Sequence, residues 1–222
     1  MTTRDTKKRN GIPQGVITRL PIYSRFLNEL KAKDIQRVSS GQLGKSLNIT
    51  AAQIRSDLSY FGSFGQHGYG YRVDELLEHI RHILGMDKLH HLILVGAGNL
   101  GRAIASYGSF RDRGFAIQGI FDSNPLLEGN FLSGCIIQPV SKLEEYLAAN
   151  RVDIGVIATP RDASQDICDR LVKNNVRGIW NFSPIHLIVP QGFIVEHMHL
   201  TDSLLRISFK LREIEQRREE TK

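Results

Sequence analysis

A glycine-rich turn between an apolar run and a helical pattern constrains the fold of this chain more than any other feature. Residues 91–95 form the apolar run, which is typical of a buried strand, and Gly96, Gly98 and Gly101 follow it as GxGxxG. The first glycine of such a unit permits a tight turn, the second lets the backbone approach a pyrophosphate, and the third lets the helix pack against the strand. The free N–H groups and positive dipole end of the helix then face the phosphates.

The next apolar segment supplies a second part of the same pattern. Residues 115–122 end in Asp122, which lies 21 residues after Gly101. Dinucleotide-binding domains place there an acid that binds the ribose hydroxyls, and it disfavours the additional phosphate of NADP. No arginine follows directly, so the sequence predicts a site for NADH and NAD⁺. The residues expected to form it are Gly96, Ala97, Gly98, Asn99, Leu100, Gly101 and Asp122.

Strand and helix patterns then alternate to about residue 200. Strands are expected over residues 135–140, 152–160, 176–182, 186–190 and 193–197, and helices over residues 141–150 and 161–175. Helices between apolar strands predict a Rossmann-like, doubly wound parallel sheet in an α/β domain. Thr159 and Pro160 end a strand at the carboxyl edge, where such folds bind ligands, and are secondary cofactor candidates. The alternative for these two residues is an ordinary strand-ending turn.

Positive charge is concentrated at the N-terminal end. Residues 1–72 hold 12 Lys and Arg against 4 Asp and Glu, whereas residues 73–222 hold 17 against 19. A basic segment fused to a nearly neutral one indicates that only the first part meets a polyanion such as DNA. A solvated basic surface without such a partner is the alternative.

The basic segment also has the pattern of a helix-turn-helix. An apolar stripe predicts a helix over residues 16–33. Ser39 with Gln42, and Thr50 with Gln53, each have the form of a capping box, which predicts two short helices joined by a tight turn. A second helix with an apolar stripe and a polar outer face is typical of DNA recognition, although a three-helix bundle that binds no DNA produces the same pattern.

A hairpin is expected directly after the recognition helix. Glycines alternate with aromatic residues over residues 61–71, which predicts the wing of a winged helix or, as the alternative, a hairpin with only a packing role. Arginine can bind guanine, and glutamine adenine, through two hydrogen bonds. The residues expected to contact DNA are Ser40, Lys45, Gln53, Arg55, Ser56, Ser59, His67 and Tyr69.

The pattern divides the chain into a DNA-binding domain (residues 1–85), a dinucleotide-binding domain (residues 86–200) and a C-terminal helix (residues 201–222). Gly85 ends a helix over residues 73–84, and Thr201 or Asp202 is expected to cap the last helix. An apolar stripe on that helix needs a partner surface, on its own domain or on a second subunit. A second subunit is favoured if the protein binds DNA, because helix-turn-helix proteins commonly bind the two half-sites of an operator as dimers. The stripe comprises Leu204, Leu205, Ile207, Phe209, Leu211 and Ile214.

Several function classes are disfavoured. The chain has no apolar run near the ~20 residues that span a bilayer, and its polar, basic start is not a secretory signal, so the cytoplasm is expected. Cys135 and Cys168 have no CxxC partner, which disfavours a zinc site or redox sensor. No metal is expected, because the histidines at 186, 197 and 199 lack a third ligand pattern and fit structural roles better. No segment of adequate size could form a substrate domain, so we expect no enzyme.

Six segments together resemble one known family. RVSSGQL, QIRSDLSYFGSFG, HGYGY, VGAGNLGRAI, VIATP and DSLLRISF occur in the same order as in the redox-sensing transcriptional repressors called Rex. The resemblance covers residues 15–209. It implies a homodimer of winged-helix and Rossmann-like domains with an exchanged C-terminal helix, which binds a palindromic operator and is released by NADH.

The resemblance also implies roles for individual residues. Arg19, Tyr107 and Asp202 fall where the family places a polar cluster that couples the two domains. Two departures concern the DNA side, because Ser56 and His67 stand where family members commonly carry basic residues. Both changes remove positive charge and imply altered operator affinity or sequence. A partly charged histidine would also make DNA binding depend on pH.

Two other functions remain open on the sequence. One is a small NAD-dependent oxidoreductase with an incidentally basic N-terminus. The other keeps the winged helix but gives the second domain another nucleotide, since strand–GxGxxG–helix units also occur in CoA-binding domains. Asp122 argues against CoA.

Overall fold

The computed structural model describes residues 12–62 and 69–220, and the chain divides into two compact units. Unit 1 is Met1–Lys88 and unit 2 is Leu89–Lys222. No helix among the described residues is both long and apolar enough to cross a membrane.

Unit 1 is a small helical domain with a short two-stranded sheet. α2 packs against α5, and α3 packs against α4. These four helices of the described part contribute to one core, which includes Leu20, Tyr23, Leu27, Leu43, Ile54, Leu58, Leu77 and Ile80. The elements are α2 (Gln14–Ala32), β1 (Arg37–Val38), α3 (Ser40–Leu47), α4 (Ala51–Ser59), β2 (Tyr71–Arg72) and α5 (Val73–Ile83).

The predicted starts of α3 and α4 are correct, but only one of the two capping boxes is complete. The Ser39 hydroxyl accepts from the Gln42 backbone N–H at 3.1 Å, and the Gln42 amide oxygen accepts from the Ser39 N–H at 2.8 Å. The Thr50 hydroxyl likewise accepts from the Gln53 N–H at 3.1 Å. The Gln53 side chain does not return this bond, because it donates to Asp57 instead. The prediction of a full box at Thr50 is therefore wrong.

Most of the predicted wing lies outside the described residues, which resume at Tyr69. β2 pairs antiparallel with β1, which precedes α3, and Arg37 lies opposite Arg72. The ribbon therefore joins the chain ahead of the helix-turn-helix to the start of α5.

Unit 2 contains the expected parallel sheet. Its seven strands have the order β5-β6-β4-β3-β7-β8-β9, and all neighbours are parallel except the edge pair β5 and β6. The strands are β3 (His90–Val95), β4 (Phe115–Asp122), β5 (Phe131–Leu132), β6 (Cys135–Pro139), β7 (Ile154–Ile157), β8 (Gly178–Asn181) and β9 (Ile194–His197). The helices are α6 (Asn99–Ala105), α7 (Leu143–Ala149), α8 (Arg161–Lys173) and α9 (Leu200–Glu220), with 3₁₀ turns at Arg111–Arg113, Pro125–Leu127 and Val140–Lys142.

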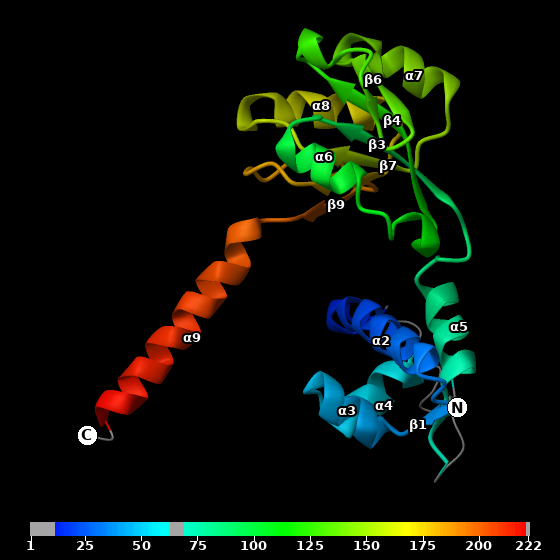
Figure 1. The fold of residues 1–222 in the computed structure, drawn as a ribbon, viewed down its shortest axis with the longest axis vertical. Coiled ribbons are helices and arrows are strands. Elements are labelled where there is room, and N and C mark those ends of the chain that lie inside the picture. The colour runs from blue at the N-terminus through cyan, green and yellow to red at the C-terminus, as the bar shows by residue number, and fades with distance from the viewer. Residues whose placement is uncertain (1–11, 63–68, 221–222) are drawn as a thin grey trace. The chain divides into compact units, whose positions relative to one another are not determined.

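Helices cover both faces of this sheet (Figure 1). Along β3, Ile93 and Val95 pack into a core shared with α7 and α8. The alternate residues Leu92 and Leu94 pack into a second core with Ile104 of α6. This alternation follows from the two-residue period of a strand. It explains why β3 is a continuous apolar run.

The strand predicted over residues 186–190 is absent, because this segment packs as an irregular loop. The Gln165 side chain replaces the missing ladder: its oxygen accepts from the Ile188 N–H and its nitrogen donates to the Ile188 carbonyl, both at 3.0 Å. Leu187 and Val189 pack against the core, which accounts for the apolar pattern. β8 and β9 are consequently parallel neighbours joined by a loop rather than by a helix.

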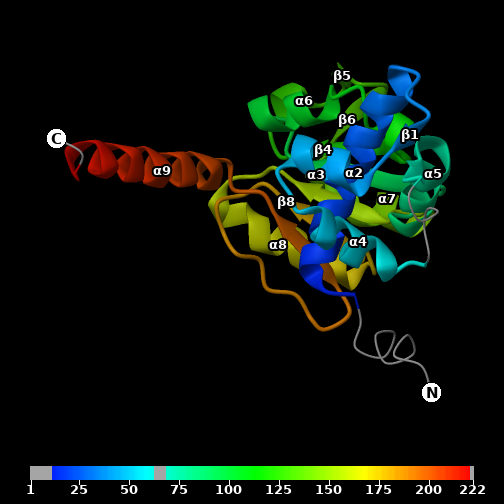
Figure 2. The same ribbon diagram turned by 90° about the horizontal axis from the view of Figure 1, so that it is seen from below.

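The C-terminal helix begins earlier than expected and exposes its apolar stripe. α9 starts at Leu200, so neither Thr201 nor Asp202 is a cap. Figure 2 shows it as one continuous helix. Every residue from 200 to 219 is exposed, including the stripe from Leu204 to Ile214, whose exposed fractions are 49–67%. The stripe therefore packs on nothing in the described part of the chain.

Candidate dinucleotide-binding and DNA-binding sites

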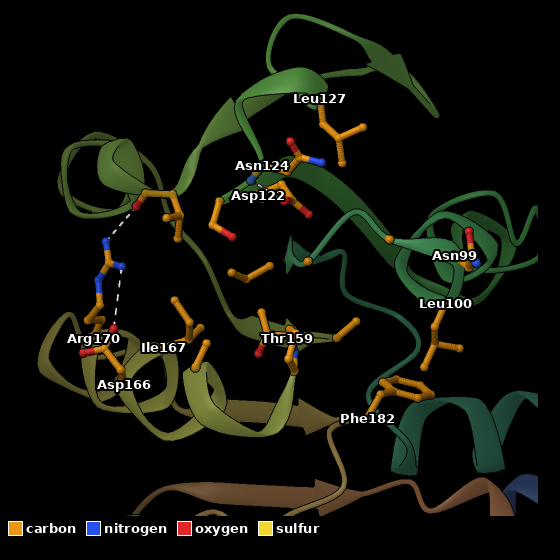
Figure 3. Close-up of a pocket in the computed structure, with 18 residues that line it drawn as sticks. Asn99, Leu100, Asp122, Asn124, Leu127, Thr159, Asp166, Ile167, Arg170 and Phe182 are labelled. Carbon is orange, nitrogen blue, oxygen red and sulfur yellow. Dashed lines mark hydrogen bonds and ion pairs between the residues drawn. The ribbon is translucent and has the colours of Figure 1, made fainter.

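A cavity of about 540 Å³ lies at the carboxyl ends of the central strands of unit 2 (Figure 3). The ends of β3, β4 and β7 contribute to it together with the start of α6 and one face of α8. Seven of the nine predicted cofactor residues line it: Gly96, Gly98, Asn99, Leu100, Asp122, Thr159 and Pro160.

The three glycines of the turn differ in what a side chain would meet. Gly96 has φ +101°, and a Cβ there would lie 2.5 Å from the Ala158 carbonyl oxygen. At Gly101 a Cβ would lie 1.8 Å from the Gly96 carbonyl oxygen, so the helix could not approach the strand. At Gly98 a Cβ would meet no atom within 4 Å. The first and third glycines are thus required by the fold, whereas the second borders open space beside the cavity.

Asp122 is bonded to the turn that it faces. Its Oδ2 accepts from the Ala97 backbone N–H at 2.6 Å, and its Oδ1 accepts from the Asn124 N–H at 2.7 Å. Each carboxylate oxygen keeps a further lone pair for a ligand hydroxyl. The Ala97 N–H is occupied by Asp122, and Ala97 itself is buried and does not line the cavity.

Thr159 and Pro160 lie where β7 passes into α8. Thr159 is on the opposite wall of the cavity from Asp122 (Figure 3). The buried Ser164 hydroxyl donates to the Pro160 carbonyl at 2.8 Å and lies 3.0 Å from the Thr159 hydroxyl. This bonding fixes the strand end. A role of Thr159 and Pro160 toward a cofactor remains a prediction.

The far end of the cavity contains residues that the sequence analysis missed. The Arg170 guanidinium donates to Glu144 and, at 2.7 Å, to the Val140 carbonyl oxygen, and Asp166 lies 3.9 Å away. The Arg170 hydrogen bonds lower the pKa of Glu144 despite the opposing effect of desolvation. Arg170 and Asp166 stand one helical turn apart on α8, yet no motif distinguishes them from surface charges. The other missed lining residues are Val95, Ser123, Asn124, Leu127, Val140, Ala158, Ala163, Ile167 and Phe182.

In unit 1, α3 and α4 pack closely as a helix-turn-helix. A Cβ at Gly44 would lie 2.4 Å from the Ile49 carbonyl oxygen, so the tight turn requires glycine there. The Arg55 guanidinium of α4 donates to the Ser40 hydroxyl of α3 at 3.0 Å. Two predicted DNA contacts from different helices are thus adjacent, and both are partly or fully exposed.

A buried carboxylate connects α4 to α2. Asp57 has no exposed surface and accepts from Arg19 at 2.6 and 2.8 Å, from the Tyr23 hydroxyl at 2.6 Å and from the Gln53 amide at 2.7 Å. Burial alone would raise the pKa of Asp57, but the hydrogen bonds from Arg19, Tyr23 and Gln53 lower it overall. Burial and the bond to Asp57 raise the pKa of Tyr23. Asp57 lies on the inward face of α4 with Ile54 and Leu58. Sequence reasoning missed it, because its partners Arg19 and Tyr23 are far away in the sequence and no local pattern predicts a buried carboxylate.

The remaining predicted DNA contacts are on the surface or outside the described residues. Lys45, Ser56 and Ser59 are exposed, and the Ser59 hydroxyl donates to the Ser56 carbonyl at 2.7 Å. Tyr69 is 70% exposed beside the two-stranded ribbon. His67 lies outside the described residues. None of these contacts is tested by the structure, and they remain predictions.

Comparison with known proteins identifies the chain. Residues 11–59 match a family described as "Putative DNA-binding protein N-terminus", and residues 87–185 match one described as "CoA binding domain". A curated relative from Thermoanaerobacter pseudethanolicus, named redox-sensing transcriptional repressor Rex, is 47% identical over 208 residues, 94% of this chain and 93% of its own. A Rex protein from Caldanaerobacter subterraneus is 49% identical over 208 residues, with the same coverage. The chain belongs to the Rex family.

Solved structures agree with this assignment. The crystal structure of RSP, a Rex-family repressor, has a TM-score of 0.89 and 44% identity, covering 96% of this chain and 100% of its own. RSP in complex with β-NADH has a TM-score of 0.88 and 44% identity, covering 94% and 98%. RSP with β-NAD⁺ and operator DNA has a TM-score of 0.88 and 46% identity, covering 95% and 97%. The two-domain fold and the expected Rex resemblance are thereby confirmed.

Rex proteins are named as repressors, which bears out the expectation that this chain is not an enzyme.

The histidines at 186, 197 and 199 lie close together in unit 2, and His197 is hydrogen-bonded to a buried side chain. The buried Asn181 oxygen accepts from the Ser183 backbone N–H at 3.0 Å, so its nitrogen is the atom that faces His197 Nδ1 at 3.0 Å. Nδ1 of His197 is therefore the acceptor, and its proton is on Nε2. Desolvation and the neighbouring His186 lower the pKa of His197, and the described residues contain no group of side chains arranged to hold a metal ion.

The three residues expected to couple the Rex domains have different surroundings. Arg19 pairs with Asp57 inside unit 1. Tyr107, at the end of α6, is 55% exposed, and its ring lies 5.0 Å from that of Phe110. Asp202 is exposed in the first turn of α9. Their coupling role remains a prediction.

Proposed function

We propose that this chain represses transcription by binding operator DNA as a homodimer, and that NADH releases it as the ratio of NADH to NAD⁺ rises. One observation carries the proposal: a chain with a helix-turn-helix also contains a cavity that is lined by the GxGxxG turn and by Asp122. Because the proposed ligands, operator DNA and NADH, are both in the cytoplasm, we infer that the protein acts there.

The lining of the cavity in unit 2 fits NADH and NAD⁺. Gly98 borders open space at the start of α6, where helix N–H groups can meet a pyrophosphate. Asp122 has free lone pairs for ribose hydroxyls, and its charge opposes the 2′-phosphate of NADPH. RSP is known in complexes with β-NADH and with β-NAD⁺ and operator DNA. We assign NADH and NAD⁺ to this cavity by similarity.

The DNA contacts that we propose are the residues predicted from the sequence. α4 would enter the major groove with Gln53, Arg55, Ser56 and Ser59, while Ser40 and Lys45 of α3 would contact the backbone. His67 and Tyr69 would contact DNA from the segment after α4. Ser56 is small and uncharged where the family commonly carries a basic residue. We therefore expect a weaker salt dependence of DNA binding than a basic residue would give.

The dimer would form through α9. The apolar stripe of this helix is exposed and packs against no other part of the described chain. An apolar face of that size requires a partner surface. A second copy of the chain supplies one by exchange of α9. The division into residues 1–85, 86–200 and 201–222 is part of this proposal.

Release by NADH requires that the two states bind it unequally. A ligand shifts an equilibrium only by its difference in affinity for the two states. NADH must favour a dimer whose two recognition helices no longer match half-sites about one helical turn, or a multiple of it, apart. NADH then lowers the affinity for DNA by the same factor by which DNA lowers the affinity for NADH.

The test is operator selection followed by release. Duplexes selected from a random pool are titrated with NADH, NAD⁺, NADPH and CoA, and binding is followed by fluorescence anisotropy. Release by NADH at far lower concentration than by NAD⁺ is expected. Equal release by both, or by neither, contradicts the proposal. Release by CoA alone would support the nucleotide named in the match to residues 87–185.

A further inference from the structure

The buried Asp57 carboxylate constrains the outward-facing side chain of Gln53. Gln53 is the third residue of α4 and is exposed, whereas Asp57 has no exposed surface. The Gln53 Nε2 atom donates to Asp57 Oδ1 at 2.7 Å. In helix-turn-helix proteins the N-terminal residues of the recognition helix contact base edges. The bond therefore acts on a side chain in a reading position.

The charge around Asp57 decides which end of the Gln53 amide faces inward. An ionised carboxylate only accepts hydrogen bonds, and this one is kept ionised by the permanently charged Arg19 and by the Tyr23 hydroxyl. Reversing the amide would set its oxygen against a carboxylate oxygen. The nitrogen is therefore the inner atom.

The oxygen of the same amide is left for a ligand. Gln53 Oε1 has no hydrogen-bond partner among the residues that the structure describes. Gln53 Nε2 faces into the protein because it donates one hydrogen to the buried Asp57 carboxylate, and its second hydrogen makes no bond to the described residues. The atom that Gln53 offers outward is then an acceptor.

We propose that Gln53 reads an exocyclic amino group in the major groove through Oε1, and that Asp57 is the positioning residue that imposes this choice. The inference rests on the proposed function as a DNA-binding repressor. Adenine N6 and cytosine N4 are the major-groove amino groups, whereas guanine offers only acceptors at O6 and N7. The two-bond contact with adenine expected from the sequence is replaced by a single bond that does not use N7.

Base analogues in the selected operator test this directly with the unmodified protein. At each adenine of a half-site, one duplex carries purine, which lacks the 6-amino group, and another carries 7-deazaadenine, which lacks N7. Pyrimidin-2-one replaces each cytosine. Removal of the amino group at one position is expected to weaken binding about fivefold, as loss of one net hydrogen bond does. The 7-deaza duplex at that position is expected to bind as the parent does.

The variant Gln53→Met assigns the effect to this side chain. Methionine has similar length and no polar hydrogen-bonding amide, so the loss on removing the amino group should disappear. Arg55→Met is the matched control, and it should keep that loss. Dependence on N7 at the same base, the absence of an amino-group effect at every position, or an amino-group effect that persists in Gln53→Met overturns the inference.

Asp57→Asn tests the positioning role. An asparagine can present oxygen or nitrogen to Gln53, so the amide orientation is no longer fixed and the difference between the analogue duplexes should shrink. If this variant does not fold, the base analogues with the unmodified protein and Gln53→Met still decide the question. Failure to select any operator overturns the proposed function and this inference together. Selection of an operator with the wrong analogue pattern overturns the inference alone.

Discussion

The Asp122 carboxylate lies 2.6 Å from the Ala97 backbone nitrogen, so the acid that ends β4 is bonded to the glycine-rich turn that follows β3. This contact orients the carboxylate before any ligand is present. It also removes the Ala97 N–H from the donors available to a pyrophosphate. The two sequence signals, the turn and the acid 21 residues later, are thus one connected structure.

Asp122→Asn should weaken NADH binding and reduce discrimination against NADPH. The amide keeps the size of the side chain but loses the charge and one acceptor, and a charged hydrogen bond contributes about 2 kcal/mol. Calorimetry should show NADH affinity about thirtyfold lower, with NADPH affected less. Asp153→Asn is the matched control, because Asp153 accepts from the His91 N–H at 2.9 Å and does not line the cavity. An unchanged ratio of the two affinities would remove Asp122 from the ribose site.

Substitutions at Gly98 and Gly101 should separate ligand binding from folding. Gly98→Val places its side chain in open space beside the cavity, so the chain should fold and bind operator but ignore NADH. Gly101→Ala forces a Cβ to within 1.8 Å of the Gly96 carbonyl oxygen and should lower the free energy of unfolding by more than ~2 kcal/mol. Thermal denaturation and NADH-dependent release measure the two effects. A retained NADH response in Gly98→Val would contradict the phosphate assignment.

Much of this site could be predicted because its constraints are local. The Ser39–Gln42 capping box and Gly101 act through neighbours a few residues away, and Gly96 has the positive φ of a tight turn, so their spacing shows their role. Asp57 and Arg170 act through partners 38 and 26 residues distant, and no local pattern marks them. The loop over residues 186–190 was mistaken for a strand because core packing and strand pairing select the same apolar residues. Only the Gln165 bonds to Ile188 distinguish the two, and these are tertiary.

Arg19→Met should destabilise unit 1 at neutral pH and reverse its response to acid. With Arg19 present, the pKa of Asp57 is below its ordinary value, so the stabilisation is present above the unfolded pKa and is lost as pH falls through the folded one. Without Arg19, burial dominates and the pKa of Asp57 rises. Stability is then lost as pH rises through that pKa. We expect a loss of about 2 kcal/mol at pH 7, reduced from the value for a fully buried pair because Arg19 is 27% exposed.

Hydrogen exchange of the α2 and α4 amides at pH 7 and pH 5 measures this change. The variant should become more protected on acidification over that range, and the parent should not. Arg151→Met is the control, because the Arg151 side chain, which pairs with Asp153, is 78% exposed. Equal pH responses of parent and Arg19→Met would show that Asp57 is not held ionised by Arg19.

Neither cysteine should serve as a redox sensor. Burial raises the pKa of the Cys168 thiol to about 11, and Cys168 has no exposed surface. Burial also raises the pKa of Cys135, whose thiol lies 3.5 Å from the Ile117 carbonyl oxygen. Because the thiolate is the reactive form, both should react with iodoacetamide at pH 8 far more slowly than free cysteine. A double Cys→Ser variant should keep its NADH response, and a lost response would restore the cysteines as candidates.

Polar substitution on the apolar stripe of α9 should abolish dimers. Leu204 and Leu211 are seven residues apart on one face and are 64% and 55% exposed. Burying each against a partner subunit contributes about 2 kcal/mol per side chain, and a two-fold interface counts every contact twice. The variant Leu204→Asn with Leu211→Asn should therefore sediment as a monomer and bind operator far more weakly. The matched control is Arg206→Asn with Glu213→Asn on the opposite face, which puts two asparagines into the same helix and should sediment as a dimer. If both variants remain dimeric, α9 is not the interface; if both dissociate, helix propensity rather than the stripe governs assembly.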